Sequence, residues 1–309
     1  MKTSFLIKKK FVGYLMFSQN RGVVMKILWT FNPFERNKDL YLSGKAILDN
    51  WFNKKDSIEV LYVASNAEAE IATAFHIPSK ERYSAYPKML IEKELSKISF
   101  SKKNIQILFD KSLSLTSLVK KIVSYSEEKN INLIVLASNS KKKLPLAILG
   151  SFAATLVHIS KCDLLIYHQK TKITSSPPLN VIYAHDLSRK GELGLKKLLD
   201  YVKKWNAHLT VVHVPIPQFG VELHDFRRIT ENKIKDLEKR LSKEKIIFNI
   251  HTEYVIRPIS EIIIELSAKS KSNIIAVTAQ ANKLSALLGG SITRQILQDS
   301  YLPTLVLKV

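Results

Sequence analysis

Two Gly-Ser pairs are the residues of this chain whose type and position could do chemistry. Gly150-Ser151 and Gly290-Ser291 each stand directly before a short apolar-periodic segment, and each segment is followed by a run typical of a buried strand. A Gly-Ser step at a helix start leaves backbone N–H groups and a hydroxyl that can face an anion. The alternative is that each serine only caps the helix it begins, which contributes about 1 kcal/mol to stability.

The segments around these pairs alternate between apolar strands and amphipathic helices, in the same order twice. Strands are expected at 26–31, 57–65, 104–110, 131–138 and 162–168, then at 180–185, 207–214, 246–255, 273–279 and 304–309. Helices are expected at 38–52, 86–98, 115–129 and 150–160, then at 191–205, 225–241, 258–270 and 290–298. Strands that are apolar throughout indicate a parallel sheet covered on both faces. The sequence therefore predicts an α/β protein of two tandem five-stranded parallel-sheet sandwiches.

A small, polar stretch with two adjacent prolines, Thr171 to Asn180, is the one linker-like segment. We therefore place a first domain at 25–170, a linker at 171–178 and a second domain at 179–309. Residues 1–24 are interpreted as an N-terminal extension that is disordered or not native. The connection from Ala67 to Ala85 is either a lid over the first site or only a long link.

Composition limits the class of protein. The chain has 309 residues, one cysteine and a formal net charge of +21. A single cysteine excludes an internal disulfide framework and favours a reducing compartment, so we expect a cytoplasmic protein. The charge comes from 39 Lys and only 9 Arg spread along the chain, which favours a solvated lysine surface over specific nucleic-acid recognition. No run approaches the roughly 18 apolar residues of a membrane-spanning helix.

Both halves resemble universal stress protein domains. In the second half the resemblance is carried by VIYAHD, by VVHV, by PISEIIIELSAKSKSNIIAV and by Gly290-Ser291 followed by YLPTLVLKV. In the first half it is carried by LYV, INLIVLAS, LGS and CDLLIY. The resemblance covers nearly everything from Met25 onward except the connection around Ala67 to Ala85. It implies a Rossmann-like fold that can hold ATP at the carboxyl ends of its strands.

Nucleotide-binding members of that family carry a Gly-x2-Gly-x9-Gly-Ser pattern, in which the first two glycines let the backbone approach phosphates. In this chain Ala137 and Ser140 occupy those positions in the first half, and Val277 and Gln280 occupy them in the second. Both halves thus keep the final Gly-Ser and lose the first two glycines. We read Val277 as the more serious loss, because a β-branched side chain resists positive φ and adds bulk.

The family's acidic residue after the first strand is kept as Asp186 and replaced by Asn32 in the first half. Lys141, between Ser140 and Gly150, either neutralises polyphosphate or belongs to a solvated loop. The resemblance implies the following nucleotide-binding candidates in the first half: Asn32, Val63, Ala137, Ser140, Lys141, Gly150, Ser151 and Phe152. In the second half it implies Asp186, Val214, Val277, Gln280, Gly290, Ser291 and Ile292.

Catalytic and metal-binding motifs are missing from the sequence. It contains no G-x-S-x-G elbow and no G-x-x-x-x-G-K-[ST] loop, and its eight histidines do not cluster at metal-ligand spacing. We therefore expect no enzyme, with slow ATP hydrolysis as the remaining alternative, and no catalytic or metal-ligating residues. The leading hypothesis is a stress-response regulator with degenerate nucleotide sites, acting through an unidentified protein partner or small ligand.

Two alternatives stay open. One is an ATP- or AMP-binding sensor that uses mainly one half, and the other is a non-specific binder of anionic polymers. No cofactor is certain. We also expect the last strands, CDLLIYHQK and YLPTLVLKV, to pair the two halves as an intramolecular pseudo-dimer, because an apolar edge would otherwise be exposed. A further homodimer is compatible with this arrangement, and no membrane association is expected.

Overall fold

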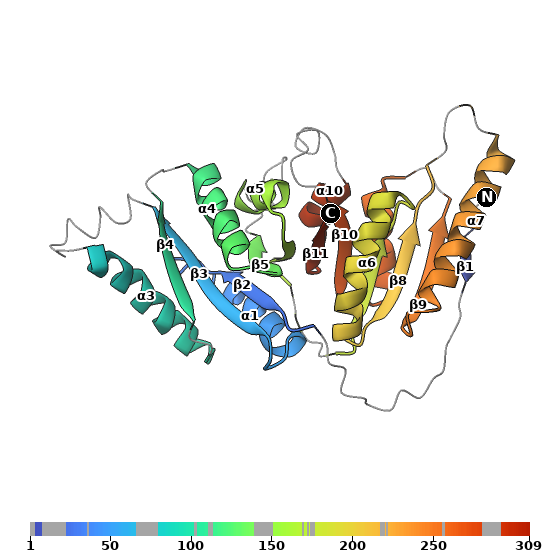
Figure 1. Ribbon diagram of the computed structural model, residues 1–309. Helices are drawn as coiled ribbons and strands as arrows, with labels where there is room; N and C mark the ends of the chain where they lie inside the picture. Colours follow the sequence, from blue (N-terminus) through green and yellow to red (C-terminus); the bar gives the residue numbers. More distant parts are fainter. Residues whose placement is uncertain are drawn as a thin grey trace. The chain divides into compact units, whose positions relative to one another are not determined.

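The computed structural model describes most of the chain (Figure 1). The described residues are 4–7, 23–35, 37–65, 80–101, 104–110, 114–138, 151–168, 170–171, 173, 177–216, 220, 222–254, 257–279 and 292–309. They form two compact units, which we call the larger and the smaller unit. The larger unit holds Val24–Thr174 and Ala279–Lys308, and the smaller holds Met1–Val23, Ser175–Thr278 and Val309.

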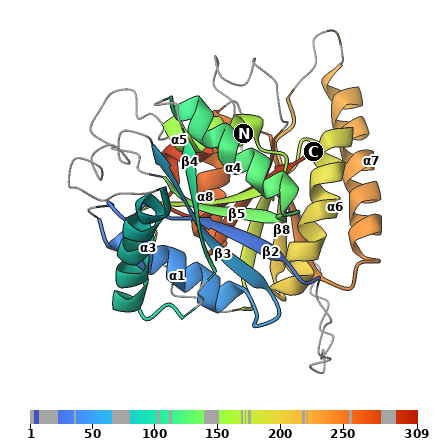
Figure 2. The same ribbon diagram turned by 60° about the vertical axis from the view of Figure 1, so that its left-hand side comes forward.

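The larger unit is a doubly wound α/β sheet with one added strand. Its strands are β2 (Lys26–Thr30), β3 (Ser57–Ser65), β4 (Ile105–Asp110), β5 (Leu133–Ser138), β6 (Asp163–His168) and β11 (Thr304–Lys308). They lie in the order β11-β6-β5-β2-β3-β4, and β2 to β6 are all parallel. Its helices are α1 (Asp39–Trp51), α3 (Lys80–Lys97), α4 (Leu115–Glu128), α5 (Ser151–Ile159) and α10 (Ile292–Asp299). Helices α1 and α3 lie on one face of the sheet, and α4 and α5 on the other (Figures 1 and 2).

The smaller unit repeats the pattern. Its strands β7 (Asn180–Ala184), β8 (His208–His213), β9 (Ile247–Glu253) and β10 (Ile274–Ala279) lie in the order β9-β8-β7-β10 and are parallel. Helices α6 (Arg189–Lys204) and α7 (Leu223–Leu241) cover one face, and α8 (Ile259–Lys269) covers the other (Figure 2). The predicted α/β fold of two matching halves is confirmed.

The predicted pairing of the last strands is also present, inside the larger unit. Strand β11 runs antiparallel to β6, with Leu305 opposite Leu165. Both strands are fully buried, so the pair removes two apolar edges from water. The backbone N–H of Lys308 donates to the Asp163 carboxylate at 2.8 Å, which fixes the register. This pairing is why residues 279–308 group with the first half of the chain instead of the second.

Within the N-terminal extension, which we expected to be disordered or not native, four residues form a strand. Ser4–Ile7 forms β1, which pairs antiparallel with β9 so that Ile7 faces Ile250 and Ser4 faces Glu253. On β9 the residues opposite β1 include the buried His251 and Thr252, whereas Ile247, beyond the pairing, is 47% exposed. The physical reason is the free edge of β9, whose unpaired backbone groups accept another strand.

Helix α3 begins earlier than the sequence indicates. We predicted its start at Tyr86, but the helix runs from Lys80 and has Pro87 inside it. Residues 80–85 of the connection are thus helical, and residues 66–79 lie outside the described part of the chain. No described helix is long and apolar enough to cross a bilayer.

Candidate functional site

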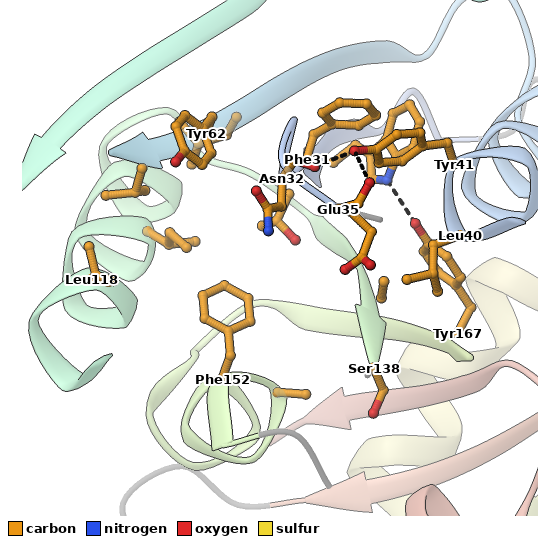
Figure 3. Close-up of a pocket in the computed structure, with 17 residues that line it drawn as sticks. Phe31, Asn32, Glu35, Leu40, Tyr41, Tyr62, Leu118, Ser138, Phe152 and Tyr167 are labelled. Carbon is orange, nitrogen blue, oxygen red and sulfur yellow. Dashed lines mark hydrogen bonds between the residues drawn. The ribbon is translucent and has the colours of Figure 1, made fainter. Parts of the chain in front are cut away.

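A cavity of about 450 Å³ opens in the larger unit at the carboxyl ends of β2, β3, β5 and β6 (Figure 3). Its location follows from the strand order. Strand β2 pairs with β3 on one side and β5 on the other, so the connections leaving this edge diverge and open a crevice. The lining residues are Trp29, Thr30, Phe31, Asn32, Glu35, Leu40, Tyr41, Leu61, Tyr62, Val63, Leu118, Ile122, Ala137, Ser138, Phe152, Ala153 and Tyr167.

One wall of the cavity is a packed aromatic cluster. The rings of Phe31 and Tyr41 are stacked with centroids 4.4 Å apart, and Trp29 meets Phe31 edge to face at 5.0 Å. The Trp29 indole N–H donates to the Tyr167 hydroxyl at 3.1 Å. Helix α1 approaches this pair closely, because a Cβ on Gly44 would lie 2.5 Å from the Tyr167 hydroxyl. The wall is therefore held by interlocking contacts and is preorganised.

The polar groups of the cavity sit on the loop that follows β2. The Asn32 side-chain oxygen accepts the Phe34 N–H at 3.1 Å, and the Glu35 carboxylate accepts the Asn37 N–H at 3.0 Å. The Tyr41 hydroxyl donates to the Asn32 carbonyl at 2.5 Å. Burial raises the pKa of Tyr41, which keeps this hydroxyl protonated as a donor. Two of these hydrogen bonds lie within the loop, and the third, from Tyr41, ties the loop to α1.

Four of the predicted first-half residues come together here. Asn32, Val63, Ala137 and Phe152 all line the cavity. Ser151 begins α5, with its side chain outside the description. Ser140, Lys141 and Gly150 lie outside the described residues.

The positions of the two lost glycines have a different backbone from the one we expected. Ala137 is inside β5 and Val277 is inside β10, and neither is among the described residues with positive φ. Val277 therefore has the extended backbone that suits a β-branched residue, and the structure does not place it at positive φ. Ala137 and Val277 therefore differ in side-chain size, not in backbone conformation.

In the second half α6 packs against side chains of β7 and β10, as α1 packs against Trp29 and Tyr167 in the first half. The Tyr183 hydroxyl donates to the Gly191 carbonyl at 2.7 Å and lies 2.7 Å from the Thr278 hydroxyl oxygen. Helix α6 packs so closely that a Cβ on Gly194 would collide with both Tyr183 and Thr278. Asp186 accepts the Ser188 N–H at 2.9 Å, as Asn32 does with Phe34. The structure thus gives Asn32 and Asp186 the same local role, which is to fix a turn.

The other second-half candidates are not gathered around a described cavity. Val214 is half-buried just after β8, and Val277 is buried in β10. Ile292 starts α10 and belongs to the larger unit. Gln280, Gly290 and Ser291 lie outside the described residues.

Two buried histidines, His185 and His213, lie at the carboxyl ends of β7 and β8 in the second half. His185 stands where the first half has Phe31, and its Nδ1 accepts the Leu187 N–H at 2.8 Å. The His185 carbonyl lies 2.9 Å from His213 Nδ1. Burial lowers the pKa of His185 to about 4, with Glu192 and Asp186 acting in the opposite direction. Both rings are therefore neutral at pH 7, because burial also lowers the pKa of His213. Among the described residues, no three His, Cys, Asp or Glu side chains are placed to hold a metal ion.

Sequence reasoning missed most of the cavity wall. Phe31 directly follows β2 and Tyr41 lies in the first turn of α1, and no sequence motif links the two. Glu35 and Tyr62 carried no motif at all. Glu35 enters because the loop folds back on Tyr41. Tyr62 lies near the carboxyl end of β3, between Leu61 and Val63, which also line the cavity.

The comparisons with known proteins agree with the fold of two matching halves. The model of the Universal stress protein family matches residues 52–168 and 179–308. Among solved structures, the chain is similar to a universal stress protein from Archaeoglobus fulgidus DSM 4304, with 19% identity, a TM-score of 0.63 and coverage of 92% of this chain and 98% of that one. It is also similar to a functionally unknown protein from Pseudomonas aeruginosa PAO1, with 14% identity, a TM-score of 0.60 and 92% of both chains covered.

A putative universal stress protein from Pseudomonas aeruginosa UCBPP-PA14 is similar at 14% identity and a TM-score of 0.57, over 92% of this chain and 93% of that one. No curated protein matches the chain. At these identities the solved structures support the fold alone, while the family model covers both halves. The chain therefore belongs to the universal stress protein family and carries two of its domains in tandem.

Proposed function

We propose that this protein is a stress-response regulator that binds a small molecule with a planar ring in the cavity of the larger unit. The observation that carries the proposal is the cavity itself, whose volume of about 450 Å³ falls in the range of small-ligand sites. Aromatic side chains form much of its wall, and such walls hold flat rings by stacking and edge contacts.

A second feature supports a ligand. The Ser138 hydroxyl, at the end of β5, is 3% exposed and has no hydrogen-bond partner within the described part of the chain. Buried hydroxyls are normally satisfied, so an orphan at a cavity wall is a natural contact for a bound molecule or a trapped water. It adds one polar contact to a mostly apolar space.

The two halves divide the work in this proposal. The first half binds the ligand, while in the second half the packing of α6 against Tyr183 and Thr278 serves stability. Binding of ATP or AMP by one half remains the competing proposal, favoured by the position of the cavity at the carboxyl ends of the strands. We further propose a cytoplasmic, non-catalytic role, in which the bound state is read by a protein partner.

The experiment uses thermal shift and calorimetry on the full chain with adenine, adenosine, AMP, ATP and a set of single-ring and two-ring aromatic fragments. Ala153→Leu should abolish binding, because Ala153 lines the cavity and is 1% exposed, so three added carbons must enter the space. Asn32→Ala should weaken binding about tenfold through one lost hydrogen bond.

The matched control is Asp186→Ala. Asp186 fixes the same kind of turn in the other half, so its removal carries a comparable structural cost without touching the cavity. Ligand affinity should be unchanged in this variant. Binding that survives Ala153→Leu, or that responds equally to both turn variants, would refute the proposal, as would no binding by any compound at millimolar concentration.

A further inference from the structure

We infer that the turn between β7 and α6 is an acid-sensitive switch, in which a proton taken up from solvent at His185 Nδ1 releases Leu187 from a left-handed backbone conformation. The inference concerns the second half of the chain and does not depend on a ligand in the cavity of the first half. It follows from the backbone, the hydrogen bonds and the packing of residues 185–192.

The backbone of Leu187 is the first observation. Its φ is 56°, in the left-handed region, where the Cβ of an L-residue lies too close to the following carbonyl oxygen. The other described non-glycine residues with positive φ follow the ends of helices, where this conformation is a common cap. Leu187 instead lies just before α6, so groups around the turn must hold it in place.

Two side chains hold the turn. His185 Nδ1 accepts the Leu187 N–H at 2.8 Å, and the Asp186 carboxylate accepts the Ser188 N–H at 2.9 Å. Because Nδ1 accepts, the neutral ring carries its hydrogen on Nε2, and a second proton binds at Nδ1. That proton faces the Leu187 N–H, and two donors cannot share a hydrogen bond. Protonation of His185 therefore removes one of the two bonds that hold this turn.

The packing around the His185 ring keeps it from turning away while the turn is closed. The side chain is fully buried, and Tyr183 meets it edge to face with ring centroids 5.4 Å apart. On the side of α6, a Cβ on Gly191 would lie 3.2 Å from two atoms of the ring and would collide with the Asp186 carboxylate. The ring thus has no room to present its other edge to Leu187, and the turn must open instead.

The charged groups around the ring do not compensate a second proton. They are Asp186 in the turn, Glu192 on α6, His213 at the end of β8 and Arg240 on α7, with Lys233 of α7 acting on His213. The strands β7 and β10 add no charged side chain. Glu192 lies 3.4 Å from Nε2, but its carboxylate also binds Arg240 at 2.6 Å.

The balance of these effects sets the direction of the pH response. Burial lowers the pKa of His185 to about 4, while Glu192 and Asp186 act in the opposite direction. When the turn opens, the ring meets water and its pKa returns toward 6.5. The closed turn is therefore fully favoured above pH 6.5, and acid favours the open turn progressively between pH 6.5 and pH 4. Although burial opposes it, hydrogen bonds from Ser188 lower the pKa of Asp186, so this carboxylate stays charged over most of the range.

The chain contains two comparisons for this switch. His213 Nδ1 lies 2.9 Å from the His185 carbonyl, which can only accept, so a second proton on His213 binds Nε2 and leaves that bond in place. In the first half, Phe31 and Pro33 stand at the positions of His185 and Leu187. Phenylalanine does not titrate, and proline fixes φ at about −65°. The switch is thus specific to the second half and to one of its two buried histidines.

The test is hydrogen exchange of the full chain at pH 8 and pH 5, followed by mass spectrometry, with rates corrected for the intrinsic effect of pH. Peptides that cover residues 186–191 should show an opening constant about thirtyfold larger at pH 5, because the pKa of His185 rises from about 4 to 6.5 on opening. Peptides from β7 and from the first-half turn at residues 31–34 should not change over the same labelling time. A rise shared equally by either of them would reflect general loosening and overturn the inference, as would no rise.

Variants separate the proton from the strain. His185→Asn supplies a side-chain oxygen that accepts the Leu187 N–H without titrating, so it should abolish the pH response. His213→Gln is the matched control and should keep the thirtyfold rise. A response that persists in His185→Asn, or that is lost in His213→Gln, would overturn the inference.

The two Leu187 variants test the switch even if His185→Asn folds poorly. Leu187→Gly should slow exchange of the turn at least about fivefold at pH 5, because glycine adopts positive φ without a steric cost. Leu187→Val should speed it, because a β-branched residue resists this conformation. Both variants should keep the dependence on pH. Equal exchange in the two variants would show that the strain at Leu187 does not drive opening and would overturn the inference.

Discussion

Acidification should destabilise this protein through His185, and the size of the effect can be worked from the structure. The side chain is fully buried at the start of the second half, with Nε2 3.4 Å from the Glu192 carboxylate. That carboxylate is itself paired with Arg240 at 2.6 Å, which reduces its ability to stabilise a charged ring. Burial therefore dominates, and the pKa falls from 6.5 to about 4.

A depressed histidine pKa means that the folded state holds the neutral ring, while the unfolded state takes up a proton below pH 6.5. The stabilisation is thus complete above pH 6.5 and is lost progressively between pH 6.5 and pH 4. At pH 5 the unfolded form is almost entirely protonated and the folded form about one-tenth protonated. The free energy of unfolding should therefore be lower by about 2 kcal/mol at pH 5 than at pH 8 from this residue alone.

The assay is urea unfolding of the full chain, followed by circular dichroism at pH 8 and pH 5, for the native sequence and for His185→Phe. Phenylalanine is the residue that the first half places at the equivalent position, as Phe31. The variant loses the acceptor of the Leu187 N–H, so its absolute stability will fall at both pH values. The decisive quantity is the difference between the two pH values.

That difference should shrink by about 2 kcal/mol in His185→Phe. What remains reflects groups such as His208 and His213, for which burial also lowers the pKa. An equal loss of stability on acidification in both proteins would show that His185 is not held neutral in the folded state, and the reasoning from burial would fail.

Two further predictions concern the strand edges. Asp163→Ala should lower the free energy of unfolding by about 1–3 kcal/mol in a urea titration, because the buried carboxylate accepts the Lys308 N–H and holds β11 against β6. The control is Asp49→Ala, which removes an exposed ion pair with Lys45. It should change the free energy of unfolding by less than about 0.5 kcal/mol. Deleting residues 1–24 should expose the edge of β9, because β1 pairs with it. The deletion variant should associate with rising concentration in sedimentation velocity and unfold at a lower urea midpoint. A variant that matches the full chain in both measurements would show that β1 does not protect this edge.

The alternation of apolar strands and amphipathic helices is sufficient to predict the fold class from the sequence alone. Runs such as INLIVLAS are apolar at every position, which only a sheet covered on both faces can bury, and the repeat of the order fixed two matching halves. The pairing of the last strands followed from the same reasoning, since neither could be left at an exposed edge. Helix ends were predicted less closely than helix positions: α3 begins at Lys80, six residues before the predicted start at Tyr86.

The sequence by itself thus determined the layers and the duplication, because these depend on periodicity and chain order. Only the tertiary structure decided what that site is made of. Asn32, Val63, Ala137 and Phe152 are distributed over four separate elements, and their joint enclosure of one cavity depends on strand order. Tertiary structure also decided that Tyr183 meets Thr278, since a hydroxyl contact across 95 residues of sequence leaves no local pattern to read.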